Sequence, residues 1–87
     1  MHFLEFSNQA KKFLKGLDNS IIERILKRIE KLKQEAVPSD AKFIGRENND
    51  KIFRYRIGNY RILYKIKEQE KNILIVKIDK REKVYDK

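Results

Sequence analysis

The chain has 87 residues and a formal net charge of +9, from 22 lysines and arginines against 13 aspartates and glutamates. This length predicts a single domain, residues 1–87, with one modest hydrophobic core. The absence of cysteine excludes a disulfide framework, a thiolate nucleophile and a cysteine-based metal site, and the lack of a long apolar stretch or a signal-peptide pattern predicts a cytoplasmic protein with no membrane partner.

The N-terminal half predicts a short strand, residues 2–6, followed by two helices. Ser7 or Asn8 can cap a first helix that runs to about Leu17. Ser20 and Glu23 have the spacing of a capping box, so a second helix starts there unless Asp18 is the cap. Pro38-Ser39-Asp40 then ends the helical pair. The buried sides are expected to carry Ala10, Phe13, Leu14 and Leu17 in the first helix and Ile21, Ile22, Ile25, Leu26, Ile29 and Leu32 in the second.

The C-terminal half predicts strands. A loop containing Gly45 and residues 47–50 leads into a β-hairpin whose strands alternate around Gly58-Asn59. After a polar turn at residues 68–72, the last strand covers residues 73–78. The predicted fold class is therefore α+β in the order β-α-α-β-β-β, an antiparallel sheet with a helical hairpin packed on one face. The pattern leaves open whether the first strand lies at an edge or inside the sheet.

Positive charge is concentrated on this hairpin. Residues 1–41 hold eight basic and six acidic side chains, whereas residues 42–87 hold fourteen basic and seven acidic ones. The window 51–67 contains six cations and no acidic residue. Alternation places Arg54 and Arg56 on the face opposite Phe53, Tyr55 and Ile57. Because the planar guanidinium contacts phosphate oxygens in pairs, this face predicts binding of a polymeric anion, a nucleic acid.

The residue types present restrict the chemistry. His2 is the only histidine, and its place at the start of a strand is typical of a surface group. No cluster of Asp, Glu and His has metal-ligand spacing, so we expect no metal or other cofactor. Tyr55, Tyr60 and Tyr64 are expected to pack in the core rather than stack on bases. Arginines can promote attack of an RNA 2′-hydroxyl on the adjacent phosphorus by positioning and charge neutralisation, and DNA lacks that hydroxyl, so the residue types favour RNA.

Three segments together resemble the RelE/ParE toxins of prokaryotic toxin–antitoxin systems. They are Phe-Arg-Tyr-Arg-Ile-Gly-Asn-Tyr-Arg-Ile-Leu-Tyr (53–64), Ile-Leu-Ile-Val-Lys-Ile (73–78) and Lys-Arg-Glu-Lys-Val-Tyr (80–85). The resemblance implies a RelE-like fold and, for the RelE branch, cleavage of messenger RNA in the ribosomal A site without a metal. It also implies a heteromeric complex with a cognate antitoxin, which the basic surface predicts to be acidic and helical, as well as contact with the ribosome.

The resemblance also assigns catalytic roles by position. Arg61 is similar to the phosphate-clamping arginine of the family, and Arg81 resembles the arginine that stabilises the transition state or protonates the leaving group. Tyr85 resembles the tyrosine that stacks on the substrate base or orients the 2′-hydroxyl. Arg54 stands where relatives often carry a lysine proposed as general base. Since arginine stays protonated, Arg54 is better assigned to electrostatic contact, and the base stays open.

Three more cations complete the expected RNA-binding set: Lys51, Arg56 and Lys65. Lys51 is the amine nearest to Arg54, but on a regular strand its odd-numbered position faces away from Arg54. Arg56 fits substrate contact, antitoxin contact or plain solvation. Two other functions stay open beside the ribonuclease: a ParE-like toxin that binds DNA gyrase, and a non-catalytic RNA-binding module.

Overall fold

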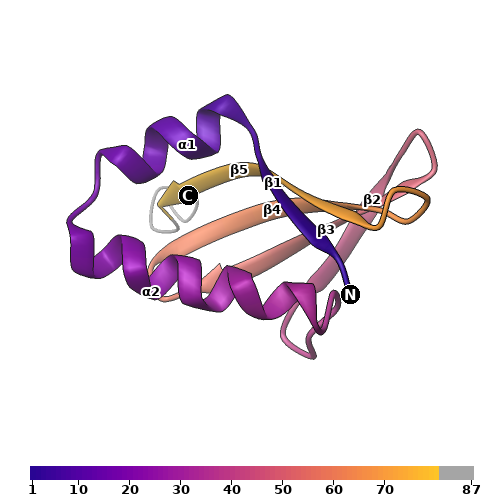
Figure 1. Ribbon diagram of the computed structural model, residues 1–87, viewed down its shortest axis with the longest axis horizontal. Coiled ribbons are helices and arrows are strands. Elements are labelled where there is room, and N and C mark those ends of the chain that lie inside the picture. The colour runs from indigo at the N-terminus through magenta and orange to yellow at the C-terminus, as the bar shows by residue number, and fades with distance from the viewer. Residues whose placement is uncertain (81–87) are drawn as a thin grey trace, which may run out of the picture.

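The computed structural model of the chain describes residues 1–80 as two helices packed on one side of a five-stranded sheet (Figure 1). This arrangement confirms the predicted α+β class. In chain order the elements are β1 (Phe3–Phe6), α1 (Asn8–Lys15), α2 (Asn19–Glu30), the short 3₁₀ helix η1 (Lys31–Lys33), β2 (Lys42–Glu47), β3 (Asp50–Ile57), β4 (Tyr60–Lys67) and β5 (Asn72–Lys80).

The sheet is mixed, with strand order β1-β5-β4-β3-β2. β2, β3, β4 and β5 form an antiparallel meander, as predicted for the C-terminal half. The expectation of a wholly antiparallel sheet is wrong at one edge, because β1 pairs parallel with β5. Between β1 and β5 the chain passes through the two helices and then through β2, β3 and β4, and the meander brings β5 back beside β1. The first strand therefore lies at an edge, the point that the sequence pattern left open.

β2 is a strand in a region where the sequence predicts a loop. Its register against β3 shifts between Phe43 and Gly45, so a bulge interrupts the alternation, and two apolar residues, Phe43 and Ile44, follow each other. Almost all of β2 is exposed, which removes the burial pattern that normally reveals a strand. Asn48 and Asn49 turn the chain into β3 with φ values of 52° and 72°, the left-handed pair that a tight hairpin requires.

The two helices begin at polar residues, of which only the first makes a side-chain capping hydrogen bond. Ser7 is the cap of α1, and its Oγ accepts a hydrogen bond from the Ala10 N–H at 3.1 Å while donating to the Val76 carbonyl at 2.7 Å. The cap of α2 is Asp18, the alternative to the Ser20 capping box. α1 ends at Lys15, two residues before the predicted end, because Gly16 closes it.

The core fills the space between the helices and one face of the sheet. Its strand residues alternate as predicted, with Phe53, Tyr55 and Ile57 of β3 buried beneath the helices. Tyr64 is fully buried at the centre, where its ring stacks on Phe53 at 5.6 Å and its hydroxyl donates to the Ala36 carbonyl at 2.6 Å. The remaining buried members are Ala10, Leu14, Ile25, Ile29, Leu32, Tyr60, Ile62, Ile66, Ile73, Ile75 and Ile78. The buried strand residues all point to the helix side of the sheet, which leaves its other side available for function.

Candidate nucleic-acid interface

The face of the sheet opposite the helices, here called the outer face, carries most of the strand cations. Since side chains alternate and directly paired residues share a face, the register places Arg54 and Arg56 of β3 on the same side as Arg61 of β4. The cations of the outer face are Lys42, Arg54, Arg56, Arg61, Lys65, Lys67 and Lys77. The structure thus brings together four of the predicted site residues, Arg54, Arg56, Arg61 and Lys65.

Two like-charged pairs lie directly opposite each other on the outer face. Arg56 pairs with Arg61 across β3 and β4, and Lys42 pairs with Arg54 across β2 and β3. Like charges opposite each other in an antiparallel pair are destabilising, by roughly 0.2–1 kcal/mol each. A sheet selected for stability alone would place an acid in one position of each pair. The arrangement is typical of a surface that meets an external anion.

On the outer face, Lys65, Lys67 and Lys77 are each paired with a carboxylate, whereas Lys42, Arg54 and Arg61 form no ion pair with any carboxylate in residues 1–80. Lys65 Nζ lies 2.8 Å from Glu47, and this hydrogen bond, with the lysine charge, lowers the pKa of the Glu47 carboxyl. Lys77 lies 3.5 Å from Asp79. Within residues 1–80, the outer-face cations that no carboxylate pairs are therefore Lys42, Arg54 and Arg61.

A depression of about 300 Å³ lies at the β2 side of this arginine cluster. Its lining residues are Asp40, Lys42, Arg54 and Arg56, three cations with one carboxylate. Guanidinium groups that converge on a concave site suit a phosphate group, because each can donate two parallel hydrogen bonds. The depression therefore has the size and donor set to hold the phosphate of a nucleotide strand.

Asp40 is held in this depression by a helix residue. The Arg28 Nη2 of α2 lies 3.3 Å from the Asp40 carboxylate and 2.9 Å from the Tyr55 hydroxyl. The Arg28 Nε is 3.2 Å from the same hydroxyl, and its guanidinium carbon lies 5.2 Å from the centre of the Tyr55 ring. Because Tyr55 is buried, Arg28 is fixed to the core and in turn fixes the loop before β2.

Lys51 is not brought to the outer face. It pairs directly with Ile66, whose side chain lies in the core, so Lys51 points to the helix side of the sheet, as alternation from Arg54 predicts. Tyr55, Tyr60 and Tyr64 are also on that side, and each is less than 9% exposed. These positions confirm that the three tyrosines pack in the core. The predicted catalytic residues Arg81 and Tyr85 lie outside the described residues.

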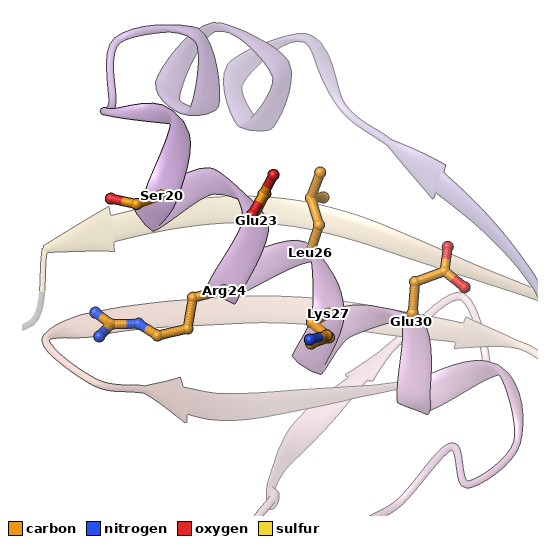
Figure 2. A pocket seen from close by; sticks show the side chains of 6 residues that line it. All are labelled: Ser20, Glu23, Arg24, Leu26, Lys27 and Glu30. Carbon is orange, nitrogen blue, oxygen red and sulfur yellow. The ribbon is translucent and has the colours of Figure 1, made fainter.

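A second hollow, of about 470 Å³, lies along α2 (Figure 2). It is lined by Ser20, Glu23, Arg24, Leu26, Lys27 and Glu30. Arg24 extends toward the β3–β4 turn and lies beside Gly58. The lining has two acidic and two basic side chains, whose charges cancel, so this hollow is less suited to a polyanion than the outer face is.

Within the described residues, no three His, Asp or Glu side chains gather where they could hold a metal ion. No helix in that part of the chain is long and apolar enough to cross a bilayer.

Sequence reasoning did not find Asp40, Lys42 or Arg28 as members of this site. Asp40 reads as a helix-ending turn residue, and Lys42 lies in a segment predicted to be a loop. Only the pairing of β2 with β3 places both beside Arg54. Recognition of Asn48-Asn49 as a hairpin turn is the sequence signal that would have predicted β2 and, with it, Lys42 opposite Arg54.

Comparison with known proteins places the chain in one family. Residues 4–85 match the family described as ParE toxin of type II toxin–antitoxin system, parDE. The RelE1 protein of Methanocaldococcus jannaschii is 32% identical over 83 residues, which cover 94% of this chain and 92% of that protein.

Two solved structures share the fold over nearly their whole length. In the archaeal RelE–RelB complex from Pyrococcus horikoshii, the matching chain has a TM-score of 0.83 and 26% identity, over 92% of this chain and 94% of that one. In the toxin–antitoxin complex RelBE2 from Mycobacterium tuberculosis, the matching chain has a TM-score of 0.75 and 25% identity, over 92% of this chain and 98% of that one. The chain belongs to the RelE/ParE family of toxins from type II toxin–antitoxin systems.

Proposed function

We propose that this toxin is a ribosome-dependent endoribonuclease that cleaves messenger RNA in the A site and so inhibits translation. The observation that carries the proposal is that two cross-strand pairs on the outer face consist of like charges, Lys42 opposite Arg54 and Arg56 opposite Arg61. A polyanion that lies across these pairs relieves their repulsion, so binding energy is available at the point where the phosphodiester must be held.

The proposed reaction needs no metal ion. The RNA 2′-hydroxyl attacks the adjacent phosphorus, and the chain positions the strand and neutralises the charge that develops on the phosphate oxygens. Arg61 holds the phosphate, Arg54 and Arg56 supply charge along the strand, and Lys65 extends the positive field. The family resemblance gives Arg81 the role of stabilising the transition state or protonating the leaving group. It gives Tyr85 the role of stacking on the substrate base or orienting the 2′-hydroxyl.

The test is cleavage of a defined message on purified ribosomes paused with an open A site. The protein is added alone, and the RNA ends are mapped by primer extension. We expect a single cut within the A-site codon. A message with one 2′-deoxynucleotide before the cut position should resist cleavage, because the attacking hydroxyl is missing. An intact ribosome-bound message, under conditions where the protein arrests translation, rules out the nuclease.

The same preparation decides between the two branches of the family. The matched family description names ParE, and a ParE-like toxin binds DNA gyrase rather than messenger RNA. A supercoiling assay with purified gyrase therefore accompanies the ribosome assay. Inhibition of gyrase without message cleavage assigns the chain to that branch, and binding of RNA with neither activity assigns it to the non-catalytic module.

We infer that a cognate antitoxin keeps the toxin inactive, since the relatives from Pyrococcus horikoshii and Mycobacterium tuberculosis were solved as toxin–antitoxin complexes. An apolar groove of about 310 Å³ on the helical side fits such a partner. It is lined by Phe6, Lys11, Leu14, Lys15, Ile22 and Leu26. An amphipathic helix can place its apolar stripe on the groove and its carboxylates against the two rim lysines. We therefore expect an acidic and helical antitoxin chain.

A further inference from the structure

The cationic depression contains one carboxylate, and this residue has no evident role in binding an anion. Asp40 lines the depression together with Lys42, Arg54 and Arg56. Its side chain is 58% exposed, so an incoming strand can reach it. A negative charge at this position weakens the attraction for phosphate, and its presence calls for a compensating function.

One oxygen of the exposed Asp40 carboxylate is contacted by a residue of α2. Arg28 contacts it at 3.3 Å and is itself fixed by two hydrogen bonds to the buried Tyr55, at 2.9 and 3.2 Å. A general base must be held within hydrogen-bond reach of the proton that it removes. The contact from Arg28 restricts Asp40 in this way while it leaves the second carboxylate oxygen available.

Other proton acceptors of the described residues are less well placed. Lys51, the amine nearest to Arg54 in sequence, lies on the opposite side of the sheet. Glu47 is engaged by Lys65 at 2.8 Å. Asp79 is on the outer face opposite Arg61, but it is paired with Lys77 and does not line the depression. Arg54 itself stays protonated and accepts no proton.

We infer that Asp40 is the general base of the proposed RNA cleavage. In this step, which rests on the proposed function, the O2′–H proton moves to a carboxylate oxygen of Asp40 as O2′ forms a bond to phosphorus. The P–O5′ bond breaks, and the departing 5′ oxygen takes a proton from solvent. Asp40 returns its proton to solvent, so that protons balance. The products are a 2′,3′-cyclic phosphate and a free 5′-hydroxyl.

The experiment measures single-turnover cleavage of a ribosome-bound message by the full chain and three variants. In Asp40→Asn the amide oxygen keeps an acceptor for Arg28 but cannot take the proton, and we expect cleavage to slow about 100-fold, as for loss of a general base. Asp40→Glu, which restores a carboxylate at the cost of an altered shape, should recover much of the rate. Asp79→Asn removes the same charge from the same face and should cleave as fast as the unaltered protein.

Binding to the ribosome and thermal unfolding are measured on the same preparations. If Asp40 acted only through packing, Asn would replace it better than Glu, and this order of rates overturns the inference. Equal cleavage by Asp40→Asn and the unaltered protein, or equal losses in the Asp40 and Asp79 variants, also overturns it. If the unaltered protein does not cut, the proposed function fails and the inference fails with it. If the unaltered protein cuts and Asp40→Asn cuts equally well, only the inference fails.

Discussion

Arg61 faces a like charge in the free toxin and is expected to contact a phosphate group in the complex with RNA. It lies directly opposite Arg56 of the neighbouring strand β3 and forms no ion pair with a carboxylate in residues 1–80. Removing it should leave the fold intact, because its guanidinium supports no contact in the core. Any change in the free energy of unfolding should be small, within about 0.2–1 kcal/mol, because Arg61 lies opposite both a like charge, Arg56, and an opposite charge, Asp79.

Cleavage, in contrast, should respond strongly to Arg61→Ala. Loss of a charge-assisted contact to the reacting phosphate raises the barrier by about 2–4 kcal/mol, which slows cleavage tens- to several-hundred-fold. Rates on paused ribosomes and growth arrest at matched expression measure this effect. Lys77→Ala is the control, since it removes a cation from the same face that Asp79 already balances. Full toxicity of the Arg61 variant would show that Arg61 is not the phosphate contact, and a lost fold would show that it is structural.

Tyr64 shows how a single buried hydroxyl ties stability to pH. Burial raises the pKa of this phenol well above its ordinary value, and the nearby Tyr55 and Asp40 add smaller contributions in the same direction. The unfolded chain ionises Tyr64 near pH 10, whereas the folded chain keeps the proton. The contribution of Tyr64 to the free energy of unfolding is therefore fully present below pH 10, and it is lost progressively as the pH rises above that value.

A Tyr64→Phe variant should separate the two effects of that hydroxyl. At neutral pH it loses the hydrogen bond to the Ala36 carbonyl and should be less stable by about 1–3 kcal/mol, because a buried acceptor is left unpaired. Above pH 10 its free energy of unfolding should fall less steeply than that of the unaltered protein. Urea unfolding at pH 7 and at pH 10–11 measures both. Parallel pH profiles for the two proteins would contradict the burial of an un-ionised phenol.

At the scale of elements, Gln9 joins α1 to the exposed edge of β5 beyond the end of β1. β1 pairs with β5 only as far as Ile75, so Ile78, which has β4 on one side, has no strand beside it on the β1 side. The Gln9 side chain takes that place, accepting from the Ile78 N–H and donating to the Ile78 carbonyl, each at 3.0 Å. A side-chain amide thus continues the sheet for one residue and fixes the last part of β5.

Gln9→Ala should therefore lower the free energy of unfolding by about 1–3 kcal/mol, since two partly buried backbone groups lose their partners. Lys12→Ala, on the same helix, removes a solvent-exposed side chain and is the matched control. Amide hydrogen exchange should show faster exchange at Ile78 in the Gln9 variant only. Unchanged protection at Ile78 would mean that the amide contact does not hold the end of β5.

The sequence predicted helices and strands correctly where the burial of one face gives their apolar residues a regular spacing. α2 has apolar residues at helical spacing, and β3 and β4 alternate strictly, so both the elements and their buried faces were predicted. β2 was missed because it lies at an edge, buries little and contains a bulge, so no period survives in its sequence. The parallel pairing of β1 depends on contacts between residues about seventy positions apart, which a local pattern does not record.

In the candidate site, too, the residues that follow a local pattern were predicted and those that depend on contacts distant in sequence were not. Arg54, Arg56 and Arg61 were predicted because alternation alone assigns them to one face. Lys42 and Asp40 escaped prediction because their places depend on which strand lies beside β3. Arg28 escaped for a different reason: on a helical pattern it reads as a solvated cation, and only the packing of α2 over Tyr55 reveals its contact with Asp40.

The whole molecule presents two different surfaces on opposite sides of one sheet. The helical side offers an apolar groove with Lys11 and Lys15 at its rim, and the outer face offers arginines around a cationic depression. Contacts of an acidic partner on either surface weaken as salt screens the charges, whereas burial of apolar area in the groove does not. The proposed antitoxin is therefore expected to bind through the groove even when salt has displaced RNA.

This separation predicts that partner binding and RNA cleavage can be lost independently. Leu26→Lys places a charge at the half-buried edge of the groove, far from the outer face, and should weaken antitoxin binding at least tenfold while cleavage by the free toxin stays unchanged. Arg61→Ala should do the reverse, since Arg61 lies on the other side of the sheet. Isothermal titration with the product of the neighbouring reading frame, at low and high salt, measures the first effect, and the ribosome assay measures the second. Were Leu26→Lys to impair cleavage while thermal unfolding is unaltered, the groove would belong to the RNA site, and the two sides of the sheet would not act separately.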